Sequence, residues 1–406
     1  MPTILSWCGI LPLPSLLMRA LGPMQLFGLM EDTGPVPRLP SGFASGAHGL
    51  RSSDGRLLLA VARSLTLPDL ADTRDNERLI LMSRLGFACL VILCLLLVGA
   101  AASAEPSVRV GALRYGTLSW QLDIIAKYGL DRKEGILIEP LELAATPATQ
   151  LALQAGRVDV IVSDWLWVSR QRAEGGDLTF IPFSSAVGAL IVPAASPIRD
   201  VAGLAGQRLG IAGSAIDKSW LVLRLFARTQ FGLDLDAHVQ KSFGAPPLLS
   251  QELAAGRLDA VLTYWPFAAK LEAGGMRRLL SVADALAALE LPRDLPLNGY
   301  VVSTPWATEN QAALDGFIAA SRAANEILAA SDAEWDRIAP LTGAADTAEL
   351  IRLREAYRDG IPRHWGAAER DAAARLYRLL AEVGGTTLVR SSPELTPGTF
   401  LDRVRY

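Results

Sequence analysis

The residues whose chemistry suggests a binding site lie in four short segments, each of which follows a predicted buried strand. These segments combine aromatic rings, carboxylates, hydroxyls, glycines and one lysine. Ligands of open parallel sheets bind beyond the carboxyl ends of the strands, so the segments are expected to meet at one cleft. The candidate ligand-binding residues are Tyr115, Gly116, Thr117, Trp120, Ser163, Asp164, Trp165, Ser214, Asp217, Lys218, Tyr264 and Trp265.

The four aromatic and hydroxyl positions nearest to helix starts also have structural interpretations. Trp120 and Trp220 lie one turn inside predicted helices and fit a hydrophobic core better than a cleft. Thr117 and Ser214 have side chains that commonly cap helices. In contrast, Trp165 and Trp265 stand at predicted strand ends, and we expect both rings at the cleft.

The charged candidates predict the character of the ligand. Asp217 suits a helix start, where a carboxylate is favourable, and Lys218 either pairs with it or binds a ligand carboxylate. If Asp164 and Asp217 both face the cleft, the ligand carries positive charge or several hydrogen-bond donors. Aromatic rings beside carboxylates suit an amine or a nitrogen heterocycle. A hard cation, recruiting Asp123 as well, is the alternative, although we expect no bound metal and no cofactor.

The overall composition argues against several other functions. The formal net charge of −3 is not that of a typical nucleic-acid-binding protein. Beyond residue 104 the histidines are His238 and His364, which leaves little material for a zinc site or a histidine-based catalytic triad. We therefore predict no catalytic residues.

An apolar run near the first quarter of the chain indicates export. Leu85–Val98 spans about 21 Å as a helix, which is short for a membrane core of about 30 Å. Arg84 precedes the run and Ala102-Ser103-Ala104 follows it, as in a secretory signal peptide. The segment 82–104 is thus predicted to be a signal peptide, with a mature chain that begins at Glu105; a retained membrane anchor is the alternative.

The sequence on either side of this segment is consistent with export. Residues 1–81 show no sustained period and are interpreted as an over-extended gene start before Met82, or else as a disordered leader. Cys8, Cys89 and Cys94 all precede Glu105, so the predicted mature chain would need no disulfide in an oxidising compartment such as the periplasm.

An internal repeat at an offset of one hundred residues organises the rest of the chain. Residues 155–165 (AGRVDVIVSDW) match residues 255–265 (AGRLDAVLTYW), and Ser119-Trp120 matches Ser219-Trp220. Each copy predicts a strand, a helix, a second helix that is stopped by glycine, and a second strand. The predicted strands are Val108–Leu113 and Val158–Val162 in the first copy, and Arg208–Ala212 and Leu258–Leu262 in the second.

Alternating strands and helices indicate parallel β-α-β units, hence an α/β fold with two lobes. We predict lobe 1 from residues 106–192 plus 300–385, lobe 2 from 193–299, and a tail from 386–406. Phe183–Pro193 and Leu297–Thr304 are the candidate hinge crossings, and the sequence after Trp306 reads as helices.

At this point the chain resembles the nitrate/sulfonate/taurine type of ABC-transporter substrate-binding protein (NitT/TauT-like), a group related to the NMT1/THI5-like pyrimidine-precursor proteins. The resemblance rests on residues 255–260 (AGRLDA), 264–267 (YWPF) and 204–211 (LAGQRLGI), and on the Gly213-Ser214 turn. It implies a type II periplasmic-binding-protein fold, a ligand held between two lobes, a periplasmic location, and an ABC permease and ATPase as partners. We also expect the protein to act as a monomer, although the sequence leaves its oligomeric state open.

Two other functions remain open on the same fold. A ligand-sensing partner of a membrane receptor would have the same binding lobes. An enzyme of pyrimidine-precursor synthesis would need a histidine in the cleft, whereas neither His238 nor His364 follows a predicted strand.

Overall fold

A computed structural model describes residues 82–88, 105–114, 116–390 and 392–405. The chain divides into two units, Met1–Val98 and Gly99–Tyr406. Residues 82–88 are helical, and most of the predicted signal peptide lies outside the described residues. None of the described helices combines the length and the apolar character that a membrane crossing requires.

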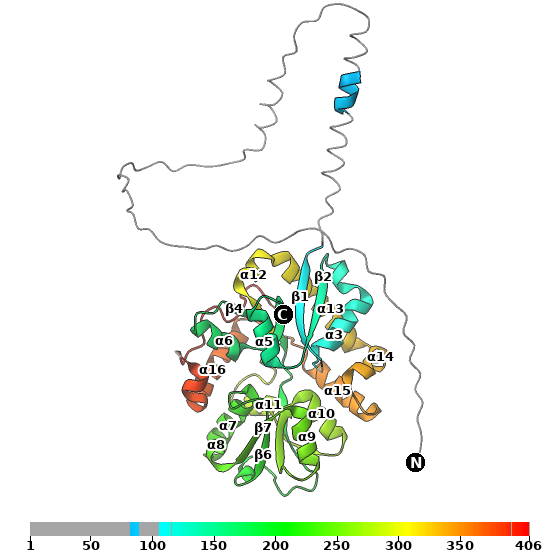
Figure 1. Ribbon diagram of the computed structural model, residues 1–406. Coiled ribbons are helices and arrows are strands. Elements are labelled where there is room, and N and C mark those ends of the chain that lie inside the picture. Colours follow the sequence, from blue (N-terminus) through cyan, green and yellow to red (C-terminus); the bar gives the residue numbers. More distant parts are fainter. Residues whose placement is uncertain (1–81, 89–104, 115, 391, 406) are drawn as a thin grey trace, which may run out of the picture. The chain divides into compact units, whose positions relative to one another are not determined.

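The described strands of the second unit form two separate five-stranded sheets, one in each lobe (Figure 1). The strands of the first sheet are β1 (Ser107–Leu113), β2 (Leu137–Leu143), β3 (Val160–Asp164), β4 (Leu178–Ser184) and β10 (Asn298–Ser303). Those of the second sheet are β5 (Gly188–Val192), β6 (Arg208–Ala212), β7 (Gln240–Gly244), β8 (Ala260–Tyr264) and β9 (Arg277–Ser281). The orders are β2-β1-β3-β10-β4 and β7-β6-β8-β5-β9, so the two sheets have equivalent topologies.

Helices cover both sheets (Figure 1). Between the strands of lobe 1 lie α3 (Leu118–Tyr128), α4 (Leu130–Lys133), α5 (Thr146–Gln154) and α6 (Trp165–Ala173). Lobe 2 contains η1 (Ala202–Leu204), α7 (Lys218–Phe231), α8 (Leu235–His238), α9 (Pro246–Ala254), α10 (Trp265–Ala273) and α11 (Val282–Ala288). The chain ends with α12 (Thr304–Glu309), α13 (Gln311–Ala330), α14 (Asp332–Thr342), α15 (Thr347–Asp359) and α16 (Ala367–Val389).

The repeated Gly-Arg-x-Asp sequence has the same structural role in both lobes. Asp159 accepts hydrogen bonds from the backbone N–H of Arg109 at 2.8 Å and from its guanidinium at 2.6 and 3.0 Å. Asp259 does the same with Arg208, at 2.8, 2.6 and 2.9 Å. In each lobe the arginine also donates to the carbonyl of the repeat's glycine, Gly156 or Gly256. In each lobe these hydrogen bonds hold the strand that carries the arginine (β1 or β6) beside the strand that follows the aspartate (β3 or β8).

The predicted elements of the repeat are present, with shifted ends. Strands β3 and β8 each begin two residues later than predicted, because Asp159 and Asp259, which directly precede them, bond to the arginines of the neighbouring strands. Helices α3 and α7 end at Gly129 and Gly232, both in the left-handed conformation with φ of 58° and 62°, as expected for glycine caps. Pro340 lies inside α14 instead of ending it, two residues before the last helical residue.

One predicted lobe boundary is wrong. Residues 188–192 were assigned to lobe 1, but β5 pairs in the second sheet with β8 and β9. The first crossing lies at residues 185–187, within the predicted range Phe183–Pro193, but the lobe boundary falls before Gly188 instead of after Val192. The cause is long-range pairing: Gly188 lies opposite Tyr264, where an added Cβ would stand 2.2 Å from the Thr263 carbonyl oxygen. The second crossing leads into β10, and this strand lies within the predicted range Leu297–Thr304.

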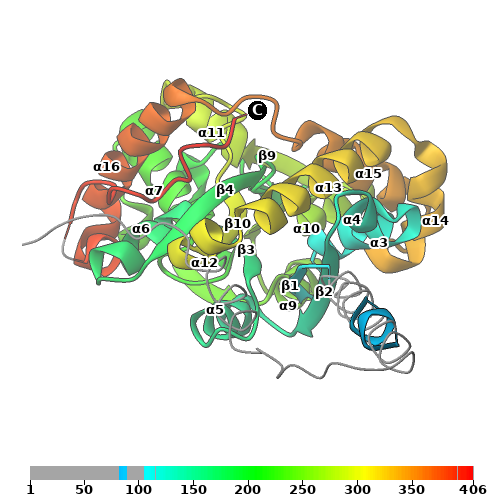
Figure 2. The same cartoon turned by 90° about the horizontal axis from the view of Figure 1, so that it is seen from above.

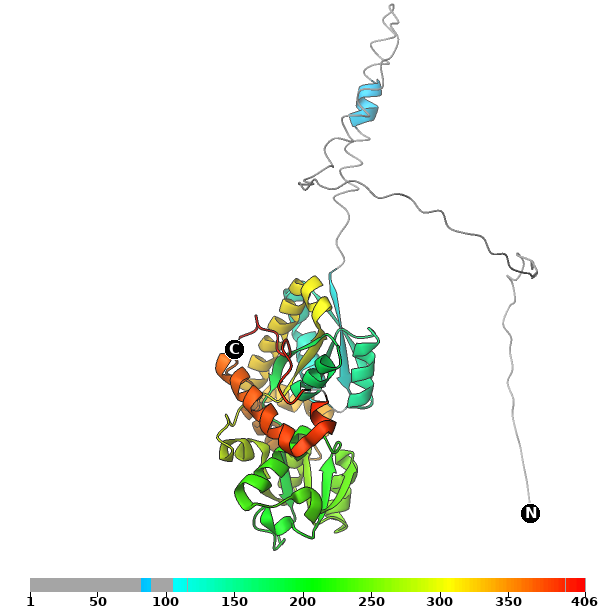
Figure 3. The ribbon, with the colours of Figure 1, turned by 90° about the vertical axis from the view of Figure 1, so that its left-hand side faces the viewer.

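Two C-terminal elements join the lobes at opposite ends of their junction (Figure 2). Helix α16 packs against α7 of lobe 2 and α6 of lobe 1, and it runs across the junction in side view (Figure 3). Helix α15 packs against α10 of lobe 2 and α14 of lobe 1. The predicted irregular tail starts later than residue 386, since α16 continues to Val389 across a kink at Gly385. The tail then runs beside β4, where Thr399 and Leu401 bond to the backbone of Phe180.

Candidate functional site between the two lobes

The cleft-facing edge of the first sheet carries a row of polar residues. Strand β1 leads to Gly116 and Thr117, β3 ends at Asp164, and β4 ends at Ser184. Strand β10 starts at Asn298, which pairs with Asp164 on one side and Ser184 on the other. Because neighbouring strands lie about 4.8 Å apart, the backbones at Asp164 and Ser184 are about 10 Å apart.

An equivalent row stands at the edge of the second sheet. Strand β6 ends before Gly213, β8 ends at Tyr264, and β5 starts opposite it at Gly188. Gly213 has a φ of 96°, and an added Cβ would stand 2.8 Å from the Tyr264 hydroxyl oxygen and 2.9 Å from Oδ2 of Asp217. Glycine is required here by the backbone conformation and by the close approach of both side chains.

Asp164 and Asp217 cap helices and face the cleft at the same time. Oδ1 of Asp164 accepts a hydrogen bond from the Trp167 N–H at 2.8 Å, which caps α6. Oδ1 of Asp217 accepts from the Ser219 N–H at 2.8 Å, which caps α7. The second oxygen of each carboxylate is left for other contacts. Both aspartates therefore have the structural role considered for Asp217, with one oxygen to spare.

Lys218 of lobe 2 reaches Asp164 of lobe 1 and so joins the two lobes. Its ammonium is 3.9 Å from Oδ2 of Asp164, and its side chain is only 11% exposed. It also lies 5.9 Å from the centre of the Tyr264 ring, within the range of a cation–π contact. Two carboxylates and one ammonium leave this charged cluster with a formal charge of −1.

Burial affects the protonation of the charged cluster. Removal from water raises the pKa of Asp217, while the neighbouring Lys218 opposes that shift. Burial and the charge of Asp217 both raise the pKa of Tyr264, so its phenol stays protonated and donates to Oδ2 of Asp217 at 3.4 Å. Oδ2 of this half-buried carboxylate has only the weak Tyr264 bond, so a positively charged ligand would stabilise it.

A second, uncharged pocket lies beside the charged cluster. Its volume is about 10 Å³, which is room for a single water molecule. The lining residues are Thr117, Phe183, Ser184, Trp265, Asn325, Tyr357, Gly360 and Ile361. Trp265 comes from lobe 2, whereas the others come from lobe 1, so the pocket exists only where the lobes meet.

Asn325 and Tyr357 were missed by the sequence analysis. The Tyr357 hydroxyl donates to Oδ1 of Asn325 at 2.6 Å, and the amide of Gln121 donates to the same oxygen at 2.9 Å. These bonds orient the amide of Asn325 with Nδ2 available for another acceptor. Both residues lie in the C-terminal helices, which have no counterpart in the repeat, so the self-comparison had no signal for them.

The predicted tryptophans separate into two kinds. Trp265 lines the pocket as predicted, with its ring edge-on to Trp120 at 5.8 Å between centres. Trp165 was also predicted at the cleft, but it is 0% exposed, and its ring packs against Tyr377 and Phe400. That prediction is wrong, because α16 and the C-terminal tail cover the ring. Trp120 is buried at 2% exposure and belongs to the core, as its position in the helix suggested.

The remaining candidate residues lie in a strand, in a turn or at a helix start. Ser163 is buried, and its hydroxyl accepts a hydrogen bond from the amide of Gln150 at 3.1 Å. Ser214 is exposed in the turn before α7, where Asp217 and not Ser214 is the cap. Thr117 occupies the cap position of α3 without a capping bond from its side chain, which leaves its hydroxyl at the pocket. Tyr115 lies outside the described residues.

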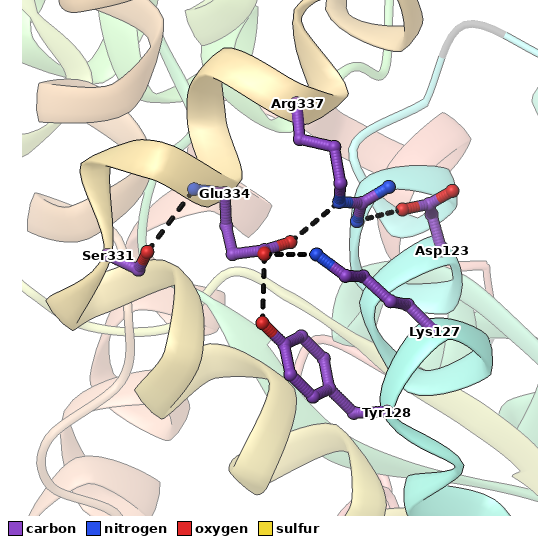
Figure 4. Close-up of polar contacts among 6 residues, drawn as sticks. All are labelled: Asp123, Lys127, Tyr128, Ser331, Glu334 and Arg337. Carbon is purple, nitrogen blue, oxygen red and sulfur yellow. Dashed lines mark hydrogen bonds and ion pairs between the residues drawn. The ribbon is translucent and has the colours of Figure 1, made fainter.

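Asp123, the additional carboxylate considered for a hard cation, belongs to a different cluster (Figure 4). It pairs with Arg337, which also donates to Glu334 at 2.7 Å. Burial alone would raise the pKa of Glu334, but hydrogen bonds from Lys127, Arg337 and Tyr128 lower it to about 2. The cluster joins α3 to α14 within lobe 1, so Asp123 is a structural residue here.

Other reactive groups lie away from the strand ends. His238 is exposed in α8, where its Nδ1 lies 2.7 Å from the Asp234 carbonyl, and His364 is exposed between α15 and α16. Among the described residues no group of three or more histidine, cysteine, aspartate or glutamate side chains is arranged to hold a metal ion.

Comparison with known proteins identifies the family. The model of the NMT1/THI5-like family matches residues 128–334, slightly more than half of the chain. No curated protein matches the sequence.

Solved structures with the same fold are numerous. The alkanesulfonate-binding protein SsuA from Xanthomonas axonopodis pv. citri, bound to MOPS, superimposes with a TM-score of 0.58 at 20% identity, over 74% of this chain and 100% of that chain. The periplasmic aliphatic sulphonate-binding protein SsuA from Escherichia coli gives 0.57 at 22% identity, over 72% and 96%. A Candida albicans protein with the generic periplasmic-binding-protein fold gives 0.51 at 12%, over 74% and 98%. The chain therefore belongs to the NMT1/THI5-like family and has the type II periplasmic-binding-protein fold that its sequence predicted.

Proposed function

We propose that this protein is the solute-binding component of an ABC importer, which takes up a small molecule between its lobes and delivers it to a permease and ATPase pair. The observation that carries the proposal is the meeting of the two strand-end rows across the lobes, with Lys218 of lobe 2 at 3.9 Å from Asp164 of lobe 1. Family membership and the binding proteins among its structural neighbours support it. The protein acts without catalysis and as a monomer.

The proposed ligand is cationic or rich in hydrogen-bond donors, such as an amine or a nitrogen heterocycle. Asp164 and Asp217 support this choice, because each has one oxygen that is not needed for helix capping. A carboxylate beside an anionic ligand would repel it, and one buried beside a neutral ligand would lack a partner.

Ligand binding is expected to stabilise the protein by mass action. At a free concentration of one hundred times Kd, the correct ligand should raise the free energy of unfolding by about 2.7 kcal/mol. Thermal unfolding with a panel of amines, nitrogen heterocycles, divalent cations, taurine and nitrate measures this, and mass spectrometry of molecules released on denaturation identifies a co-purified ligand. A protein that releases no small molecule and responds to none would contradict the binding function. Stabilisation by taurine or nitrate alone would contradict only the proposed ligand class.

We further propose that residues 82–104 are a signal peptide that directs the protein to the periplasm. The short apolar run, Arg84 before it and the Ala-x-Ala sequence at its end support this. Expression from Met82 should yield a periplasmic protein whose first residue is Glu105, as read by N-terminal sequencing. A chain that stays in the membrane fraction with Leu85–Val98 attached would indicate an anchor instead.

A further inference from the structure

The C-terminal end of α14 is capped by its own Thr342 and by side chains from two other helices, α3 and α10. The last carbonyl groups of a helix receive no backbone hydrogen bond from within the helix, and they carry partial negative charge. Here the Thr342 hydroxyl donates to the Ala339 carbonyl at 2.8 Å, and Nε1 of Trp120 donates to the Leu341 carbonyl at 3.2 Å. Lys270 donates to the Thr342 carbonyl at 3.1 Å and also to the Gly343 carbonyl.

The lysine in this cap belongs to the other lobe. Lys270 lies in α10 of lobe 2, whereas α14 packs with α3 in lobe 1. Loss of water around the ammonium lowers the pKa of Lys270, while the charge of Glu349 opposes that shift. Gly343, with a φ of 61°, keeps this contact short, since an added Cβ would stand 3.3 Å from Nζ. The carbonyl groups at this helix end therefore accept hydrogen bonds from an ammonium group of lobe 2.

The same helix brings Trp265 to the pocket. Trp265 is the first residue of α10, and Lys270 follows about 7.5 Å further along the helix axis. The ring of Trp265 is edge-on to Trp120 at 5.8 Å and to Tyr357 at 6.3 Å. Two contacts at separate points along one helix determine its direction relative to lobe 1, which a single contact would not.

We propose that Lys270 is a positioning residue, which holds α10 against lobe 1 by capping α14 and so places Trp265 against Trp120 and Tyr357 at the small pocket between the lobes. Trp120 completes the arrangement, because its ring contacts Trp265 while its Nε1 caps the same helix end. The inference concerns the contact of α10 with lobe 1, and it does not depend on the identity of the ligand.

The test uses the ligand-free full-length protein and the variant Lys270→Met, which keeps an unbranched side chain but removes the donor. The near-ultraviolet circular dichroism of the tryptophan cluster should fall to that of Trp265→Phe. Hydrogen exchange should rise at least tenfold in peptides around residues 265–270 and 339–345. Lys270→Arg, which can still donate to both carbonyls, should restore the spectrum and the protection.

The matched control is Lys241→Met, which removes a lysine of β7 that pairs with Asp236 inside lobe 2. It should change neither the tryptophan spectrum nor exchange at the junction. Exchange that rises evenly over both lobes in Lys270→Met, or a spectrum that Lys270→Arg does not restore, would show general stabilisation and overturn the proposal. An unchanged spectrum in Lys270→Met would overturn it as well.

Discussion

Replacing Trp165 by alanine is expected to lower the free energy of unfolding by about 3–5 kcal/mol, as for other large-to-small changes of buried aromatic residues. Its ring is fully buried, with Tyr377 and Phe400 at 6.4 and 6.1 Å between ring centres. Its Nε1 also donates to the Pro296 carbonyl at 3.1 Å, and that buried acceptor would lose its partner. Chemical denaturation of wild type and variant measures the difference.

Trp265→Ala is the matched control, because Trp265 occupies the same position of the repeat and also begins a helix. It is partly exposed at the lobe junction, so its loss should destabilise the fold less and should weaken ligand binding instead. If Trp165→Ala kept the stability of wild type but lost affinity, the sequence-based prediction of Trp165 at the cleft would be right after all.

The contrast between these tryptophans shows what a repeat can predict. Similar local sequence produced similar local structure: an aspartate bonded to an arginine of the neighbouring strand in each lobe, and a tryptophan directly after β3 and β8. The surroundings of each tryptophan are decided by elements outside the repeat. Helix α16 and the tail cover Trp165, whereas α15 and its neighbours leave Trp265 beside a pocket. No local pattern carries that information.

The same reasoning explains the wrong lobe boundary. Residues 188–192 form an apolar run that suits a buried strand in either sheet. Their sheet is determined by pairing with residues 261–264, which lie 70 to 76 positions away in the sequence. A short apolar run cannot reveal such a partner. Gly188 was nevertheless a usable signal, because a glycine in a strand often marks a site where another backbone approaches closely.

The polar residues at strand ends were the most predictable part of the site. Asp164, Asp217 and Lys218 lie at the junction because the carboxyl ends of parallel strands share one edge of a sheet. Their distances across the junction depend on contacts between the lobes that no local sequence pattern encodes. Sequence alone therefore placed these groups at strand ends, but it could not show that Lys218 of one lobe would reach Asp164 of the other; that they bind a ligand stays a prediction.

Asp164→Asn and Asp217→Asn are each expected to weaken binding of a cationic ligand by about 1.5–3 kcal/mol, the range for a lost hydrogen bond to a charged group. Asparagine is a good helix cap, so it can still accept the Trp167 or Ser219 N–H and should leave the fold intact. The substitutions thus remove the charge of the second oxygen and little else. Calorimetric titration with the amine or heterocycle identified for the wild type measures the loss.

Two further variants separate a charge effect at the cleft from a general effect of removing an aspartate. Asp234→Asn changes the cap of α8, which accepts the Asp236 N–H at 3.0 Å on the surface of lobe 2, and it should leave affinity unchanged. Lys218→Met removes the ammonium that competes for Asp164 and should strengthen binding of a cation while weakening that of an anion. If instead wild type binds taurine or nitrate tightly, and the Asn variants bind them as well or better while Lys218→Met loses them, then Lys218 is the ligand's partner. In that case the two carboxylates serve as helix caps alone, and the ligand is an oxyanion.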